Sequence, residues 1–175
     1  MSYIGKWQNW YTGTLEPQSY GAPLTYEIAA KWLGGIDVED WGVGKGYFQS
    51  IYPGNVVGVD GTKTKFSDVV ADLTEYTSST PGLFMRHVIE HNLEWKKVLQ
   101  NAADSFTEKM VLVLFTPMAK KTQQIAWNDG VEVPDMSFAQ RDIVKYFKDC
   151  DIKWKDHKTA TQYGTERVFL IERKQ

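Results

Sequence analysis

Residues 36–48 read IDVEDWGVGKGYF, a short strand-like run followed by three closely spaced glycines. The run from Ile36 to Trp41 has the length and residue types of a β-strand, and the glycines stand where it ends. Glycines between a strand and a helix let a ligand approach the backbone, and N–H groups at the helix start favour an acceptor-rich or negatively charged ligand. This segment predicts a strand, a ligand-binding turn at Gly42, Gly44 and Gly46, and a short helix to Tyr52.

The spacing of these glycines separates classes of cofactor. A dinucleotide site requires G-x-G-x-x-G, whereas Gly42, Gly44 and Gly46 give G-x-G-x-G. A phosphate-binding P-loop ends in Gly-Lys-Ser/Thr after a four-residue gap, but Lys45 is followed by glycine. Both sites are therefore disfavoured, and with them redox chemistry that depends on NAD. A nucleoside with a compact amino-acid tail fits a turn of this length.

Strand-length apolar runs alternate with helical patterns along the chain. After the first strand, further strands are expected at 56–60, 68–72, 83–86, 110–115, 152–154 and 167–171. Helices are expected at 24–33, 92–106 and 137–147, and residues 118–134 form a polar stretch without a clear period. Residues 61–67 are too few for a helical crossover. The pattern predicts an α/β three-layer sandwich with a mostly parallel, doubly wound seven-stranded sheet and a C-terminal antiparallel hairpin.

Length and charge limit the functions open to the chain. Its 175 residues predict a single domain with an aromatic arm and helix (1–34), a cofactor-binding half (35–118) and a C-terminal, substrate-side half (119–175). The formal net charge of -2 disfavours a nucleic-acid partner. The chain has no apolar run of membrane-spanning length and no signal-peptide pattern. Because it also has one cysteine, Cys150, which we place in a late helix, we expect a cytoplasmic monomer or homodimer without a membrane partner.

The segments from 35 to 118 resemble, in order, those of the class I methyltransferases that use S-adenosylmethionine. The first segment is Asp40-x-Gly42-x-Gly44-x-Gly46, and acidic residues follow at the ends of the second and third strands, at Asp60 and Asp72. The resemblance implies that Asp60 accepts hydrogen bonds from the ribose hydroxyls, a role that suits a carboxylate. It places Asp72 beside the adenine amino group and the Leu73 backbone against the ring edge.

The resemblance thus implies a set of contacts with S-adenosylmethionine, whose product is S-adenosylhomocysteine. These contacts are Asp40, Trp41, Gly42, Gly44, Gly46, Asp60, Gly61, Asp72, Leu73, Arg86 and His87. The sequence departs from the family at Trp41, where a smaller apolar residue is usual, and at Val43, where a cysteine-like residue is common. Neither change removes a polar contact.

The stretch His87-Val88-Ile89-Glu90-His91 supplies the candidate catalytic residues, His87, Glu90 and His91. On a helix these three side chains would share one face and could bind a divalent metal, although we expect no metal to be bound there. A second interpretation is that Glu90 and His91 cap and orient the turn while His87 packs beside the cofactor. A third is general-base chemistry, because an imidazole titrates near neutral pH. The aromatic arm, with Trp7, Trp10, Tyr11 and Tyr20, either holds an acceptor or covers the core.

These features favour an enzyme that moves a methyl group to an oxygen or nitrogen of a small molecule. No Asn/Asp-Pro-Pro-Tyr/Phe motif follows the fourth strand, and Cys150 does not follow a proline, so two known routes to base methylation are unsupported. The short region before the first strand leaves little material for binding a macromolecule. The alternative is a non-catalytic module that binds S-adenosylmethionine, or the partner subunit of a modification complex.

Overall fold

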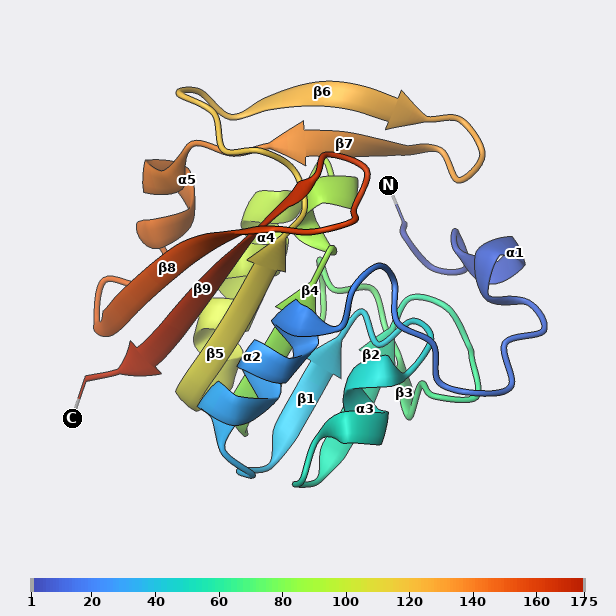
Figure 1. Ribbon diagram of the computed structural model, residues 1–175, viewed down its shortest axis with the longest axis horizontal. Coiled ribbons are helices and arrows are strands. Elements are labelled where there is room, and N and C mark those ends of the chain that lie inside the picture. Colours follow the sequence, from blue (N-terminus) through green and yellow to red (C-terminus); the bar gives the residue numbers. More distant parts are fainter. Residues whose placement is uncertain (1, 175) are drawn as a thin grey trace.

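The computed structural model describes residues 2–174, which form two β-sheets. The larger sheet has seven strands in the order β3-β2-β1-β4-β5-β9-β8 (Figure 1). These strands are β1 (Val38–Trp41), β2 (Val56–Asp60), β3 (Val69–Val70), β4 (Thr80–Arg86), β5 (Phe106–Leu114), β8 (Cys150–Lys158) and β9 (Thr165–Arg173). Strands β1 to β5 run parallel, whereas β9 is antiparallel to both β5 and β8. The strand order reverses between β1 and β4, where ligands bind in open sheets of this kind.

Helices cover both faces of this sheet. On one face, α2 (Leu24–Leu33) and α3 (Tyr47–Ile51) contribute to one buried apolar cluster, and on the other, α4 (Trp95–Ser105) and α5 (Gln140–Val144) contribute to a second. Two shorter helices are α1 (Gln8–Tyr11) and the 3₁₀ helix η1 (Ile89–His91), and Ile89 of η1 joins the α4-side cluster. Within residues 2–174 no helix is long and apolar enough to cross a bilayer. The three-layer α/β sandwich predicted from the sequence is confirmed.

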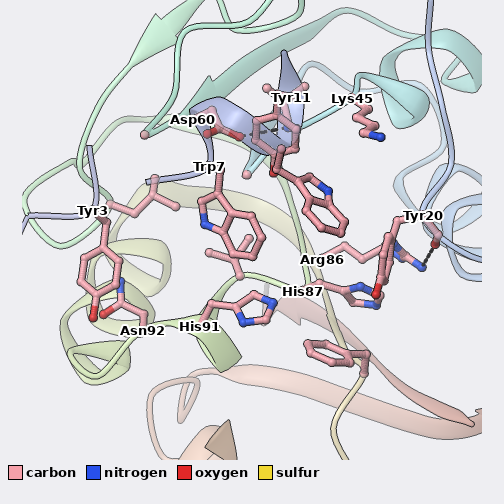
Figure 2. A pocket seen from close by; sticks show the side chains of 18 of the residues that line it. Tyr3, Trp7, Tyr11, Tyr20, Lys45, Asp60, Arg86, His87, His91 and Asn92 are labelled. Atoms are coloured by element: carbon pink, nitrogen blue, oxygen red, sulfur yellow. Dashed lines mark hydrogen bonds between the residues drawn. The ribbon is translucent and has the colours of Figure 1, made fainter. Parts of the chain in front are cut away.

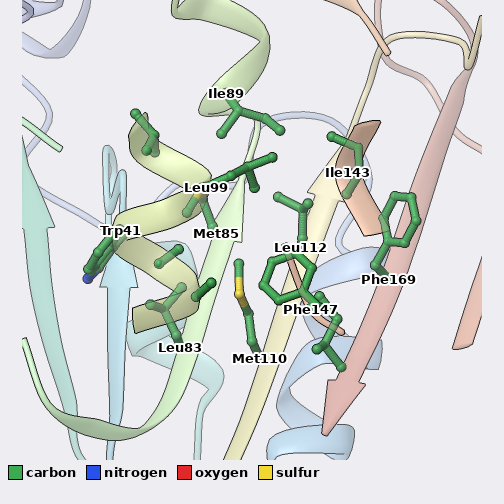
Figure 3. Packing of buried hydrophobic residues seen from close by; sticks show 14 of the residues in the cluster. Trp41, Leu83, Met85, Ile89, Leu99, Met110, Leu112, Ile143, Phe147 and Phe169 are labelled. Carbon is green, nitrogen blue, oxygen red and sulfur yellow. The ribbon is translucent and has the colours of Figure 1, made fainter. Parts of the chain in front are cut away.

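The alternation of side chains along β5 explains why the central strands read as continuous apolar runs. Met110, Leu112 and Leu114 face the α4 side, while Val111 and Val113 face the α2 side, and all five are fully buried. Figure 3 shows Met110 and Leu112 among the side chains of the α4-side cluster. Burial of each large apolar side chain contributes about 1.5–3 kcal/mol relative to exposure. These strands therefore anchor the sheet whose ends carry the site.

Several local expectations are confirmed. Helix α2 ends at Gly34, which has a φ of 68° and donates its N–H to the Ala30 carbonyl. The connection from β2 to β3 contains no helix, as its length predicts. The final strands β8 and β9 pair antiparallel at one edge of the sheet, and each is longer than the sequence indicates.

The region from 118 to 150 differs from the sequence prediction. It contains a second, two-stranded sheet made of β6 (Gln123–Asn128) and β7 (Val133–Ser137), and α5 covers only part of the expected helix at 137–147. Strand β6 is largely exposed and β7 is buried at every position, so neither shows the alternation of a half-buried strand. Pro134 also argues against a strand. Cys150 begins β8, so its placement in a late helix was wrong.

Candidate functional site

A cavity of about 220 Å³ lies at the carboxyl ends of the parallel strands (Figure 2). Its floor includes the glycine turn after β1 and the residues that follow β2, β3, β4 and β5. Its other walls include the N-terminal arm, which we define as residues 2–20, together with Asp135 of β7 and Gln162. Figure 1 shows β1 and β5 pointing toward the side of the molecule that the β6–β7 hairpin crosses. The arm and the C-terminal half thus enclose the ends of the sheet.

The glycine turn forms as the sequence predicts. Gly42 has a φ of 85° and donates its N–H to the Val59 carbonyl at 2.7 Å. A Cβ atom at this position would lie 2.3 Å from Cγ2 of Val88, so a side chain is excluded by contact as well as by conformation. Gly44 has a φ of 49°, and its N–H donates to Oδ2 of Asp60 at 3.0 Å. The turn thereby joins the end of β1 to the end of β2.

Asp60 lines the cavity and is held by two backbone donors. Its Oδ2 accepts the Gly44 N–H, and its Oδ1 accepts the Thr62 N–H at 2.9 Å. Burial raises the pKa of Asp60 to about 6, although the backbone hydrogen bonds oppose this rise. A carboxylate has about four lone-pair sites, so the hydrogen bonds from Gly44 and Thr62 leave acceptor capacity for a ligand. Gly61 and Leu73 also line this end of the cavity.

Asp72 follows β3 beside the cavity, and its contact with an adenine stays a prediction. It does not line the cavity, and its Oδ2 accepts the Tyr3 N–H at 3.1 Å. Its Oδ1 accepts both the N–H and the hydroxyl of Thr74, at 3.0 and 2.8 Å. Burial acts to raise the pKa of Asp72, but these hydrogen bonds outweigh it, and the pKa lies below its usual value. Asp72 therefore anchors the arm beside the cavity.

The arm forms a roof over the cavity. Gly5 donates its N–H to the Gly61 carbonyl at 2.7 Å, and the Tyr3 hydroxyl accepts the Leu93 N–H at 2.8 Å. Trp7 packs against the His91 ring, with 5.0 Å between ring centroids, and stacks on Tyr11. Figure 2 shows Trp7 lying across the cavity between Asp60 and His91. The aromatic residues of the arm thus line a cavity and do not simply cover the core.

Four other candidates lie outside the cavity wall. Asp40 is buried, and desolvation, with the nearby Asp60 charge, raises its pKa well above the usual value. Trp41 belongs to the apolar core and donates its indole N–H to Glu39 at 2.8 Å. Gly46 forms a backbone bridge with Gln18 of the arm. Glu90 is completely buried and accepts the Phe115 N–H at 2.7 Å. Their direct contact with a ligand stays a prediction.

Two histidines line the opposite end of the cavity, and each faces a carboxylate. His87 Nε2 lies 2.7 Å from Oε1 of Glu166, and His91 Nδ1 lies 3.2 Å from Oδ1 of Asp135. Nδ1 of His91 also lies 3.1 Å from the Pro134 carbonyl, which can only accept, so it carries the proton. The Phe115 ring lies against both imidazoles, with centroid distances of 4.8 and 5.3 Å.

Arg86 forms an ion pair with the same Glu166 oxygen that His87 contacts. Its Nη2 lies 2.8 Å from Oε1 of Glu166, and its Nε donates to the Thr25 hydroxyl at 3.1 Å. Among residues 2–174 no three histidine, cysteine or acidic side chains come together as a metal-binding group. The H-x-x-E-H stretch also departs from a single helical face, because His87 lies before η1 with a φ of 57°.

Sequence reasoning missed both carboxylates that face the histidines. Asp135 lies in a strand that the sequence did not indicate. Glu166 had a signal, because it lies two residues before Val168 and therefore shares the buried, α2-facing side of β9. The Tyr163 hydroxyl donates to Oδ2 of Asp135 at 2.8 Å, and the sequence analysis did not assign Tyr163 to the site.

No family model matches this sequence, and none of the curated proteins searched matches it. Solved structures do resemble it. Magnesium protoporphyrin IX methyltransferase from Synechocystis PCC 6803, with bound S-adenosylmethionine, has a TM-score of 0.65 and 16% identity, over 96% of this chain and 91% of that chain. A 1,6-didemethyltoxoflavin-N1-methyltransferase from Burkholderia thailandensis, with bound S-adenosylhomocysteine, has a TM-score of 0.65 and 12% identity, over 86% and 76%.

A third structure comes from Haloferax volcanii, a complex between the Trm112 methyltransferase activator and a methyltransferase. It has a TM-score of 0.65 and 11% identity, over 97% of this chain and 96% of that chain. At these identities the likeness concerns the fold, because one fold supports several activities. The chain therefore has the fold of the class I methyltransferases that use S-adenosylmethionine.

Proposed function

We propose that this protein is an S-adenosylmethionine-dependent methyltransferase that acts on an oxygen or nitrogen of a small molecule. The observation that carries this proposal is one cavity that joins the glycine turn and Asp60 at one end to His87 and His91 at the other. The first end has the chemistry to hold a nucleoside with an amino-acid tail. The second end has imidazoles and aromatic faces suited to an acceptor.

The proposed donor site uses residues that already line the cavity. The ribose hydroxyls donate to the free lone pairs of Asp60, and the adenine lies near Gly61 and Leu73. Gly42 and Gly44 carry no side chain, so the amino-acid tail can approach their backbone in the space beside Val88 and Tyr11. In this assignment Asp40, Trp41, Gly46 and Asp72 shape the wall from behind.

The proposed acceptor site lies between the arm and the C-terminal half. When bound, S-adenosylmethionine supplies a methyl group that its sulfonium has already activated, so the protein needs mainly to orient the acceptor. Trp7, Tyr20 and Phe115 offer ring faces, and His87 and His91 offer polar atoms beside them. Glu90 acts indirectly in this assignment, because it fixes the backbone of Phe115. The roof and the cavity volume favour a small acceptor.

The test is turnover by the purified chain alone. The protein is incubated with S-adenosylmethionine and a panel of phenols, hydroxylated heteroaromatics and amines, and S-adenosylhomocysteine is measured. The proposal predicts product that depends on one class of acceptor. Binding of S-adenosylmethionine without turnover on any acceptor would instead support the non-catalytic module or partner subunit. Absence of binding would contradict both functions.

A further inference from the structure

Glu166 of β9 is a fully buried carboxylate with an uneven distribution of partners. Its Oε1 accepts from His87 Nε2 at 2.7 Å, from Arg86 Nη2 at 2.8 Å and from the Thr25 hydroxyl at 3.1 Å. Its Oε2 has no hydrogen-bond partner among residues 2–174. Burial acts to raise the pKa of Glu166, but the His87 hydrogen bond and the Arg86 charge outweigh it, so the carboxyl is ionised.

The backbone of His87 is strained, which indicates that its position is fixed by more than local preference. Its φ of 57° lies in the left-handed region, which non-glycine residues adopt at an energetic cost. The His87 N–H donates to the Val113 carbonyl at 3.0 Å. The imidazole packs against the Phe115 ring and against the edge-on ring of Tyr20. Figure 2 shows Tyr20 beside His87. These contacts aim the imidazole between Glu166 and the cavity.

The two ring nitrogens of His87 have different roles. An ionised carboxylate can only accept, so the short contact with Glu166 requires a proton on Nε2. Burial and the adjacent Arg86 charge lower the pKa of His87 to about 3, against the opposing effect of Glu166, so the ring is neutral. Nδ1 then has a lone pair. It has no hydrogen-bond partner among the described residues, and His87 lines the cavity.

We propose that Glu166 is a positioning residue that holds His87 as its Nε2–H tautomer and presents Nδ1 to the methyl acceptor. This inference rests on the proposed function and narrows its substrate class. Because Nδ1 is a hydrogen-bond acceptor, the substrate arrives with a protonated nucleophile, and a hydroxyl group on a planar ring fits the aromatic walls best. A substrate that is already an anion would face a lone pair and is disfavoured.

The proposed step transfers the methyl group in line from sulfur to the acceptor oxygen. The acceptor oxygen forms a bond to the methyl carbon, the carbon–sulfur bond breaks, and its electron pair stays on sulfur. The hydroxyl donates a hydrogen bond to Nδ1 of the neutral His87, which orients an oxygen lone pair toward the methyl carbon, and the proton passes to water as the carbon–oxygen bond forms. The products are the methyl ether, S-adenosylhomocysteine and one proton.

The experiment that tests this proposal measures which ring nitrogen of His87 carries the proton. Nitrogen-15 NMR of the histidine side chains, in the full chain, is recorded for the wild type, Glu166→Gln and Glu172→Gln. Glu172 is a matched control, because it is a half-exposed carboxylate on the same strand whose ion-pair partner among residues 2–174 is Lys109, at 4.0 Å. We expect a protonated Nε2 and a bare Nδ1 in the wild type and in Glu172→Gln. In Glu166→Gln, whose amide both donates and accepts, we expect mixed tautomers.

Binding and turnover separate this inference from the proposed function. Calorimetry with S-adenosylmethionine is expected to give the same Kd for all three proteins, and kcat on a phenol acceptor is expected to fall by about 100-fold in Glu166→Gln alone. A wild-type ring with the proton on Nδ1 would overturn the inference, as would a Glu166→Gln protein with unchanged tautomer and unchanged kcat. Absence of S-adenosylmethionine binding would contradict the proposed function while the tautomer remains measurable. The wild-type spectrum tests the proposed tautomer of His87 even if Glu166→Gln does not fold.

Discussion

Asp60 is the residue on which the proposed donor site depends most. It is the only acidic residue of the predicted cofactor set that lines the cavity among residues 2–174, and it also accepts the Gly44 N–H. Replacement by alanine removes the proposed acceptor for the ribose hydroxyls. We expect Asp60→Ala to weaken binding of S-adenosylmethionine by about 1–3 kcal/mol in calorimetry.

Asp68 provides the control for Asp60. Its carboxylate also accepts a backbone N–H, that of Gly58 at 2.8 Å, but it does not line the cavity. Asp68→Ala is expected to retain the wild-type affinity. Equal affinities for wild type and Asp60→Ala would contradict the role of Asp60.

Glu90 makes folding stability depend on pH. Burial raises its pKa from 4.5 to about 7, and its Oε2 has no partner among the described residues. Between these two pH values the folded state keeps a proton that the unfolded state has released, so this residue lowers stability as pH rises from about 4.5 to 7. Glu90→Gln keeps an acceptor for the Phe115 N–H and removes the charge.

We therefore expect Glu90→Gln to be more stable than the wild type at pH 8, by up to about 3 kcal/mol, and similar to it at pH 4. Urea denaturation at both pH values measures the difference. Glu16→Gln, on the exposed arm, makes the same chemical change and should show no such dependence. Parallel pH profiles for wild type and Glu90→Gln would refute this account of Glu90.

At the scale of elements, the glycine turn depends on the absence of a side chain at Gly42. The positive φ disfavours any other residue, and a Cβ would collide with Val88. We expect Gly42→Ala to lose about 1–3 kcal/mol of stability and to bind S-adenosylmethionine weakly. Gly164→Ala isolates the conformational part, because Gly164 has a φ of 69° with no atom near its virtual Cβ. If both variants lose equal stability and both bind normally, contact with Val88 has no role.

The arm is the element whose motion we expect binding to change. Trp7 and Tyr11 line the cavity, and lifting of the arm would break the hydrogen bonds donated by the Gly5 and Leu93 amides. At about 100 times its Kd, S-adenosylmethionine should slow hydrogen exchange at these two amides by as much as about 100-fold. The Lys174 amide, bonded to Asp149 far from the cavity, should be unaffected. Unchanged exchange at Gly5 would show that the arm does not close the site.

In the whole molecule, the features that could be predicted from the sequence are those formed by residues close together in the chain. The strand β1, its glycine turn and Asp60 follow one another closely, and the apolar runs of buried strands identify the parallel sheet. The hairpin β6–β7 could not be predicted in this way, because one strand is exposed and the other is buried throughout. The pairing of His87 with Glu166 spans 79 residues and depends on β9 returning beside β5. That juxtaposition exists only in the assembled sheet.

Every functional proposal for this protein requires that the cavity bind S-adenosylmethionine, which calorimetric titration of the full chain measures. We expect micromolar affinity, about -8 kcal/mol, for S-adenosylmethionine and for S-adenosylhomocysteine, and no binding of NAD. Absence of heat with either adenosyl compound, from protein that circular dichroism shows to be folded, would contradict these proposals.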